Sequence, residues 1–457
     1  MTNTKFVFLA TFSGSGSKLL QAQLSNLKNI FTIPAYPLLY FYPHFNEWKK
    51  IYKNKLNAKK VLHLILKKHK SIVDSRKIKG FNGLTNLGEN KKQFLKISEI
   101  QFKKNFLKSL ENKKINSANV IKAIHFAYKK TINDNKPLNL FHIHSIEYLN
   151  KYGAKDFPES KIIFTIRNPI YNFWRRIYSD VKIENIRFDY TDKEYLKNYL
   201  YLNRLRDIYI TFKNINISLK KRAKFIKFED IKLDNSKIIK KICKFLKIKY
   251  DQNNFTKLGF LGKKWWGDKI YKGYNEKQNF VKSNFNYDIE LNSFAKYEIL
   301  ILKKILSPYL SKFRYLKKNS IIESFLTNIL FLFILFFPTK YGFKLFLKRF
   351  NLFNFLRYVE NLYNEVFKNN LNNYYFNAMY KYKWNYRIAY LTKYDFLRKY
   401  IFYNQQSVLV KIVYFIYKIL LYFYYQLELF FLYFIRIYLI FCIFFIVRKK
   451  INNLNFS

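Results

Sequence analysis

Four short apolar runs, separated by stretches with helical spacing, set the pattern of the first half of the chain. The runs are KFVFLAT at 5–11, LNLFHIH at 138–144, KIIFTI at 161–166 and KFIKF at 224–228. Each has the length of a buried strand, whereas KLLQAQLSNLKN, which follows the first run, has the spacing of an amphipathic helix. Strands that alternate with helices predict an α/β fold with a central parallel sheet flanked by helices.

Polar or ionisable side chains stand at or directly after the end of each predicted strand. They are Thr11, His144, Arg167 and Glu229. In an open parallel sheet the carboxyl ends of the strands share one edge, and ligands bind beyond that edge. The pattern therefore predicts an active site there.

The character of the chain changes after about residue 316. Residues 324–338 (SFLTNILFLFILFFP) are strongly apolar, and residues 408–447 are almost wholly aliphatic and aromatic. We therefore expect an α/β domain at 1–315 and a hydrophobic helical C-terminal region at 316–457.

This C-terminal region has one narrow basic stripe. On a helix, Lys411, Lys418 and Arg436 fall within ~20° of one another. The stripe predicts membrane contact through a helix lying in the interface, with its cations toward lipid phosphates. Residues 429–447 are also long enough for a membrane-spanning helix, although placing the charge of Arg436 near the middle of a bilayer is costly. A soluble helical bundle is the alternative.

The composition of the chain is unusual, but by itself it does not identify what the protein binds. The formal charge is +55 over 457 residues, and such a charge attracts anions. Lysine is spread along the whole chain, together with Asn, Ile, Phe and Tyr, as an AT-rich coding sequence would also produce. No nucleic acid is expected as a partner on this ground. Two cysteines, Cys243 and Cys442, form neither a disulfide framework nor a zinc spacing, and no metal is expected.

The start of the chain reads as a buried strand rather than as a leader segment. We therefore expect the catalytic part to be cytoplasmic, with a peripheral position at the inner face of a membrane.

The loop TFSGSGSKLL at 11–20 can wrap an anion. Gly14 and Gly16 permit tight turns, and successive backbone N–H groups before a helix N-terminus favour negative charge. The Walker A spacing is absent. A plain turn between strand and helix is the alternative.

Four segments in order make the chain resemble the PAPS-dependent sulfotransferases (PAPS is 3′-phosphoadenosine 5′-phosphosulfate), nearest to polysaccharide-type members. Residues 11–20 resemble the family's 5′-phosphosulfate loop, and KIIFTIRNP at 161–169 resembles its 3′-phosphate element. Residues 224–250 resemble the y-E-D-L…FLG stretch, and GKKWWGD at 262–268 is similar to a late G-x-x-W-x-G segment.

The resemblance implies a P-loop NTPase-like sulfotransferase fold, with PAPS as co-substrate and no metal. The residues that would bind the 5′-phosphosulfate are Gly14, Ser15, Gly16, Ser17 and Lys18.

Two positions depart from the family pattern. The family has a cation where this chain has Gly14, and Lys18 is our candidate to replace it. Eight residues after Arg167, where the family has a serine, this chain has Arg175. Arg167 and Arg175 would hold the 3′-phosphate, since arginine suits phosphate through bidentate hydrogen bonds.

The catalytic candidates implied by the same resemblance are His144, with His142 in reserve, and Lys18. His144 falls where cytosolic-type members carry a base, which would accept the proton of the acceptor hydroxyl. Glu47 is a further candidate, because some branches use a carboxylate. A pair of hydrogen-bonded structural histidines is the alternative for the HIH sequence.

These observations predict a sulfotransferase that acts on a hydroxyl, with a saccharide or glycolipid as the expected acceptor. A non-catalytic membrane or glycan-assembly protein with a degenerate fold, and a P-loop phosphotransferase, are the rival interpretations.

Overall fold

The computed structural model describes most of the first 315 residues and the last helix. The described residues are 5–11, 14–34, 38, 40–77, 84–143, 146–177, 193–214, 222–250, 258–267, 294–315, isolated positions between 340 and 419, and 433–451.

The chain divides into two compact units that alternate along the sequence. The first contains residues 1–172, 210–289 and 449–457, and the second contains 173–209 and 290–448. Residue 315, near which the sequence predicts a boundary, lies inside the second unit.

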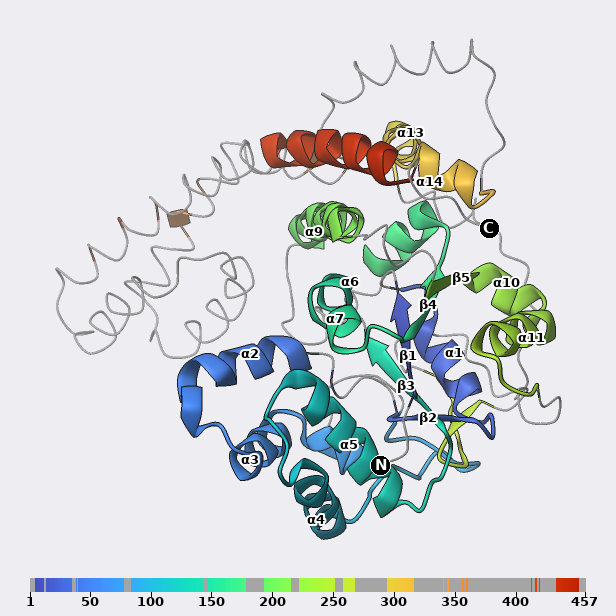
Figure 1. Ribbon diagram of the computed structural model, residues 1–457. Helices are drawn as coiled ribbons and strands as arrows, with labels where there is room; N and C mark the ends of the chain where they lie inside the picture. The colour runs from blue at the N-terminus through green and yellow to red at the C-terminus, as the bar shows by residue number, and fades with distance from the viewer. Residues whose placement is uncertain are drawn as a thin grey trace. The chain divides into compact units, whose positions relative to one another are not determined.

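A five-stranded parallel sheet forms the centre of the first unit (Figure 1). The strands lie in the order β2-β3-β1-β4-β5 and every neighbouring pair is parallel. Their bounds are β1 Lys5–Thr11, β2 Ile30–Thr32, β3 Leu138–Ile143, β4 Lys161–Ile166 and β5 Ala223–Lys227. The predicted parallel sheet flanked by helices is confirmed. The sequence did not predict β2, which has three residues.

The rest of the described chain contains helices and one pair of short antiparallel strands, joined by turns and irregular segments. The helices with eight or more residues are α1 Ser17–Leu24, α2 Phe41–Tyr52, α3 Ala58–Lys68, α4 Glu99–Leu110, α5 Ser117–Thr131, α9 Lys193–Asn214, α11 Asn235–Leu246 and α13 Lys296–Ile305, with a helix at 169–177 and one at 433–451. The shorter elements are α6 Ile146–Tyr148, the π-helix Leu149–Gly153, α7 Ala154–Asp156, α10 Phe228–Leu233, α14 Ser307–Lys312, the 3₁₀ turns Lys53–Lys55, Lys70–Ile72 and Ser75–Lys77, and the β6–β7 pair at Gly259–Phe260 and Lys263–Lys264.

Local sequence explains where several of these helices begin. A side-chain oxygen of Asn57, Ser98, Asn116 or Asp234 accepts a backbone N–H at the start of α3, α4, α5 or α11. These are the residue types that satisfy the first free N–H groups of a helix.

The two faces of the sheet pack against different helices. On one face, Leu9 of β1 and Ile163 of β4 share a core with Leu20 of α1 and Ile239 of α11. On the other face lies Phe8, which Gly153 approaches closely: a Cβ on Gly153 would stand 3.2 Å from the Phe8 ring. The result is a helix–sheet–helix sandwich (Figure 1).

All five strands point the same way, so their carboxyl ends meet at one edge. At that edge Thr11 of β1 is in register with Thr165 of β4, and the Thr165 hydroxyl donates a 2.8 Å hydrogen bond to Thr11 Oγ1. The loops after β1, β4 and β5 therefore leave the sheet side by side.

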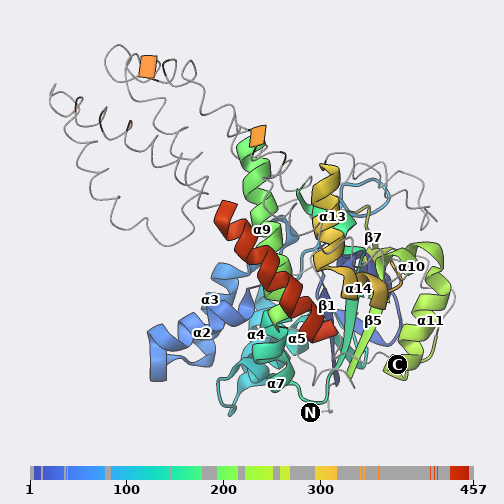
Figure 2. The ribbon, with the colours of Figure 1, turned by 90° about the horizontal axis from the view of Figure 1, so that it is seen from above.

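In the second unit, the helix at 433–451 packs against α9 and α13 (Figure 2). Its Arg436 is 2% exposed, and its guanidinium carbon lies 6.0 Å from the centre of the Tyr201 ring. Burial raises the pKa of Glu298 in α13, and the charge of Arg436 opposes that rise.

The prediction that Arg436 points toward lipid phosphates is therefore wrong. A buried guanidinium needs a carboxylate and polar or aromatic neighbours, and Glu298 and Tyr201 provide them here. Lys411 and Lys418 lie outside the described residues. Among the described residues, no helix combines the length and the apolar character that crossing a bilayer requires.

Candidate active site

The loop between β1 and α1 has the backbone shape that its glycines predict. Gly14 (φ 83°) and Gly16 (φ 76°) both adopt the left-handed region that side chains disfavour. Gly16 is the residue before helix α1, and no side chain caps that helix. The N–H groups of the first turn, which includes Ser17 and Lys18, lack intrahelical acceptors and favour an anion.

Ser15 lies at the centre of this loop. It is fully buried, and its hydroxyl has no hydrogen-bond partner within the described part of the chain. A buried hydroxyl without a partner is costly unless a ligand or water satisfies it. Lys18 lies half-buried on the first turn of α1. Together these groups suit a phosphate or sulfate.

Phe228 joins this loop to the turn after β4. A Cβ on Gly16 would stand 2.1 Å from Cδ2 of Phe228, so only glycine fits there. The guanidinium carbon of Arg167 lies 4.6 Å from the centre of the same ring, and 4.2 Å from the ring of Tyr171. The glycine loop and Arg167 therefore lie on the same side of the sheet edge.

Hydrogen bonds hold the turn at Arg167 in place. The side-chain oxygen of Asn168 accepts the N–H groups of Ile170 and Tyr171, at 3.0 and 3.2 Å, and so caps the helix at 169–177. The backbone N–H of Asn168 donates to Oε1 of Glu229 across 2.9 Å. Glu229 is buried at the start of α10, and it fixes the turn rather than reacting.

Positive charge gathers around Arg167, which is only 9% exposed. Burial lowers the pKa of Lys232 in α10, and the positive charge of Arg167 lowers it further. An anion bound between these two cations would offset the repulsion between them. The sequence did not single out Lys232 or Phe228; the only signal was that Phe228 ends a predicted strand and Lys232 follows it by four residues.

His142 lies on β3, 3% exposed, facing α1. Its Nδ1 lies 2.9 Å from Oε1 of Gln21, whose amide nitrogen donates to Thr32 Oγ1 and to the carbonyl of Ile33. These bonds make Oε1 the acceptor and Nδ1–H the donor. The contact favours a structural role for His142.

The remaining predicted residues are His144, Arg175 and Glu47. His144 lies outside the described residues, so its role stays a prediction. Arg175 lies half-buried in the helix at 169–177 and belongs to the second unit, and its role also stays a prediction. Glu47 is an exposed residue of α2.

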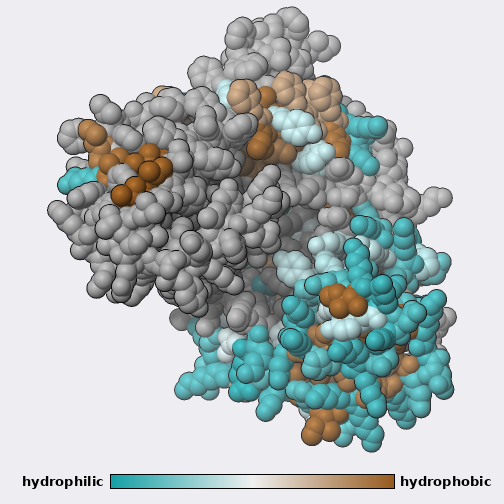
Figure 3. Space-filling model, turned by 90° about the vertical axis from the view of Figure 1, so that its left-hand side faces the viewer, coloured by the Kyte–Doolittle hydropathy of each residue, from teal (hydrophilic) through white to brown (hydrophobic). Residues whose placement is uncertain are grey.

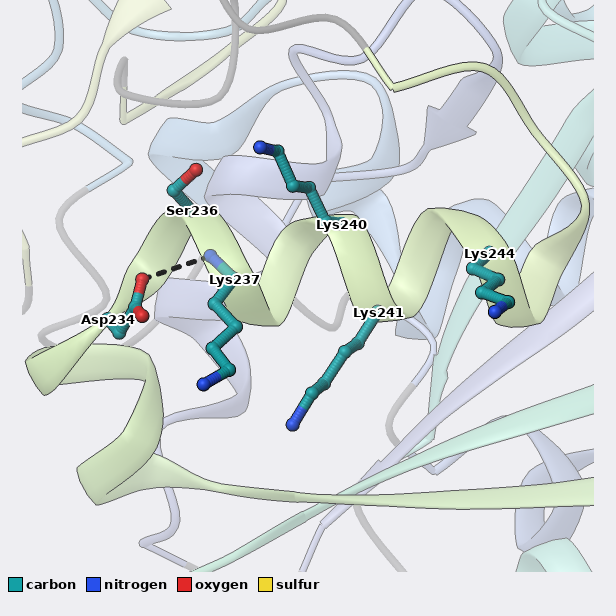
Figure 4. A pocket seen from close by; sticks show the side chains of 6 residues that line it. All are labelled: Asp234, Ser236, Lys237, Lys240, Lys241 and Lys244. Carbon is teal, nitrogen blue, oxygen red and sulfur yellow. Dashed lines mark hydrogen bonds between the residues drawn. The ribbon is translucent and has the colours of Figure 1, made fainter.

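A cavity of about 400 Å³ lies along α11 (Figure 4). Four lysines of that helix line it, together with Ser236 and with Asp234, whose Oδ1 accepts the backbone N–H of Lys237. None of the predicted site residues lines this cavity. Over the described part of the chain, no three His, Cys, Asp or Glu side chains gather as a metal site would require.

Residues 7–252 match the family model described as the sulfotransferase family. No curated protein matches.

The solved structures that the chain matches include three sulfotransferases. The sulfotransferase domain from the curacin biosynthetic pathway is 13% identical, with 62% of this chain and 82% of that chain covered and a TM-score of 0.33. The sulfotransferase domain from the Synechococcus PCC 7002 olefin synthase is 15% identical, with 56% and 78% covered and a TM-score of 0.30. Sulfotransferase STF9 from Mycobacterium avium is 9% identical, with 68% and 77% covered and a TM-score of 0.34.

Proposed function

Because this chain belongs to the sulfotransferase family and is a transferase, we propose that it moves a sulfuryl group from PAPS to a hydroxyl acceptor. One observation carries the proposal: the ring of Phe228 contacts both the glycine loop and Arg167. The two ends of one doubly phosphorylated adenosine can then be bound along a single sheet edge.

The 5′-phosphosulfate would bind at the glycine loop. Its oxygens would accept hydrogen bonds from backbone N–H groups of residues 14–18 and from the Ser15 hydroxyl, which lacks a partner within the described chain. Lys18 would supply the cation that Gly14 does not. Backbone donors and a nearby ammonium stabilise charge that develops on transferring oxygens.

The 3′-phosphate would bind at the turn after β4. Arg167 would donate hydrogen bonds to it, and Lys232 would add a second charge from α10. Arg175 is the third candidate for this phosphate. Charge-assisted bonds from a partly buried guanidinium are among the stronger polar contacts in proteins.

In the transfer step, the acceptor oxygen attacks sulfur while the bond from sulfur to the bridging phosphate oxygen breaks. His144 would accept the proton of the attacking hydroxyl. The products are a sulfate ester and adenosine 3′,5′-bisphosphate. A positioned base of this kind contributes roughly 10²–10⁴ in rate.

For the acceptor we propose a saccharide or glycolipid hydroxyl, and for the location the cytoplasmic side of a membrane, where the chain is peripheral. The resemblance to polysaccharide-type members supports the sugar. The exposed apolar side chains of the second unit, such as Phe434 and Phe445, support a position at a lipid surface.

Calorimetry with adenosine 3′,5′-bisphosphate tests the nucleotide site directly. We expect saturable binding with a stoichiometry of one, and turnover of PAPS that persists in EDTA. Radiolabelled donor incubated with cell extract then identifies the acceptor through the labelled product.

Two results would replace the proposal. A chain that does not bind adenosine 3′,5′-bisphosphate would be a scaffold with a degenerate fold. A chain that turns over ATP with a strict requirement for Mg²⁺ would be a phosphotransferase.

A further inference from the structure

The helix at 433–451 exposes a row of large apolar side chains. Phe434 is 63% exposed, Tyr438 64% and Phe445 65%, with Ile435 and Phe441 also exposed. Residues at spacings of four, seven and eleven lie on one face of a helix. Figure 3 shows brown, apolar residues next to pale ones in the upper part of the view. Exposed contiguous apolar patches mark interaction surfaces.

The opposite face of the same helix is already occupied. Ile440, Ile443 and Val447 are fully buried, and Arg436 is buried between them and the neighbouring helices. The helix thus has apolar side chains on both faces, while the described residues of the chain cover only one of them. A helix that is apolar all round is normally buried in a protein core or in lipid.

The chemistry of the exposed row fits lipid. Phe is typical of the apolar face of helices that lie in a membrane interface, and Tyr438 adds a hydroxyl that can remain in water at the headgroup level. Four further large apolar side chains of the second unit are more than 40% exposed: Phe343, Leu356, Ile412 and Ile416.

Positive charge lies at the C-terminal end of the row. Arg448 is exposed, and its guanidinium carbon lies 4.2 Å from the centre of the Phe444 ring. Burial lowers the pKa of Lys304 in α13, and the charge of Arg448 lowers it further, so these two cations lie close enough to repel. Anionic headgroups relieve such repulsion, and the net charge of +55 draws the chain toward an anionic surface.

We propose that the second unit docks on an anionic membrane surface through the face formed by Phe434, Ile435, Tyr438, Phe441 and Phe445, with Arg436 turned into the protein. This inference deepens the proposed peripheral location and rests on it. The helix lies along the surface, so that its aromatic side chains enter the interface and Arg448 contacts the headgroups.

Vesicle sedimentation of the full chain tests the inference. The probe is phosphatidylcholine vesicles containing phosphatidylglycerol, compared with vesicles of phosphatidylcholine alone. We expect the double variant Phe434→Gln/Phe445→Gln to bind the mixed vesicles at least about tenfold more weakly. The variant lacks the favourable free energy of moving two apolar rings from water into lipid. Its unfolding midpoint should equal that of the parent, because both rings are exposed.

The matched control is Ile51→Gln/Ile100→Gln, which removes two exposed apolar side chains of the first unit. The control should bind vesicles as the parent does. Raised salt should weaken vesicle binding by the parent and by both variants. The difference in vesicle affinity between the parent and the Phe variant should persist, because salt does not screen the apolar contribution.

Equal vesicle binding by the parent and the Phe variant would overturn the inference. A parent that dimerises in sedimentation equilibrium, and a Phe variant that is monomeric with unchanged vesicle binding, would also overturn it, because the face would then join two copies of the chain. Vesicle binding is measured without nucleotide. A failure of the sulfotransferase proposal would therefore appear in the calorimetry and leave this result unaffected.

Discussion

The backbone N–H of Asn168 donates a hydrogen bond to Oε1 of Glu229 across 2.9 Å. This bond joins the turn after β4 to the first residues after β5, two neighbouring strands of the sheet. Because Asn168 also caps the helix at 169–177, the direction of the preceding Arg167 depends on the bond. A carboxylate that takes no part in the chemistry thus positions the proposed phosphate ligand.

Glu229→Ala should therefore reduce both stability and nucleotide affinity. The substitution leaves the partly buried N–H of Asn168 without its acceptor, which costs up to about 1–3 kcal/mol. Chemical denaturation measures the loss, and calorimetry with adenosine 3′,5′-bisphosphate measures the affinity. Glu229→Gln keeps an oxygen acceptor and should recover most of both quantities. Equal behaviour of the two variants would show that the hydrogen bond does not set the turn.

Gly16→Ala should disturb the glycine loop through two effects. The left-handed backbone at φ 76° costs an alanine roughly 1–2 kcal/mol, and the new Cβ would meet Phe228 at 2.1 Å. We expect a marked loss of affinity for adenosine 3′,5′-bisphosphate, because the Phe228 ring or the loop must shift.

Gly262→Ala is the control for the backbone effect. Gly262 has nearly the same φ, 75°, but no described atom lies within 4 Å of its Cβ position. It should show the backbone cost in denaturation while nucleotide affinity remains that of the parent. If Gly16→Ala proved no worse than Gly262→Ala in either measurement, the Phe228 contact would have no role in the site.

Arg167→Ala should weaken adenosine 3′,5′-bisphosphate binding by about 10–100-fold, since a hydrogen bond to a charged group contributes about 1.5–3 kcal/mol. Arg222→Ala is the matched change at the opposite end of the sheet, where Arg222 donates hydrogen bonds to the carbonyls of Phe157 and Pro158. Calorimetry should find the affinity of Arg222→Ala unchanged. If the two arginine variants had the same affinity for adenosine 3′,5′-bisphosphate, Arg167 would not be a phosphate ligand.

The strands of the sheet could be predicted from the sequence because their signals are local. KFVFLAT, KIIFTI and the other two runs are apolar, have strand length, and have a polar residue at or directly after their end. Strand β2 could not be predicted in this way, because the three residues IFT are too few to show a period.

Residues of the candidate site could be chosen from the sequence only where the pattern lies within a single segment. The glycine loop and Arg167 each follow a strand, and the sequence alone shows this. Phe228 and Lys232 lie beside Arg167, which is distant from them in the sequence, and no local pattern predicts such contacts. Arg436 is the same case: a helical wheel places it on a basic stripe, whereas Glu298 and Tyr201 draw it inward.

His125 should make the stability of the first unit depend on pH. It is buried among Phe6, Phe31 and Phe141, and burial lowers its pKa from 6.5 to about 3. Between these two values the unfolded chain binds a proton that the folded chain does not, so stability falls as the pH falls below 6.5. The slope from this one residue approaches about 1.4 kcal/mol per pH unit.

His125→Leu should remove this slope. Neither ring nitrogen of His125 has a hydrogen-bond partner within the described residues, so an apolar side chain of similar size loses no bond. Urea unfolding at several pH values between 4 and 7 measures the difference between parent and variant. Parallel curves for the two proteins would mean that His125 is protonated alike in the folded and unfolded chains.

His144→Ala should abolish turnover of PAPS while leaving the affinity for adenosine 3′,5′-bisphosphate nearly intact. A general base acts on the acceptor hydroxyl and not on the nucleotide, so the loss should appear in kcat, by about 10²–10⁴. The comparison variant is His142→Asn, which keeps a side-chain N–H for Gln21, the partner of His142 Nδ1 at 2.9 Å; its turnover should stay near that of the parent. Single-turnover assays with labelled donor measure the step itself. Unchanged turnover in His144→Ala would remove that histidine from the mechanism. A loss of turnover found only in His142→Asn would instead identify His142 as the base.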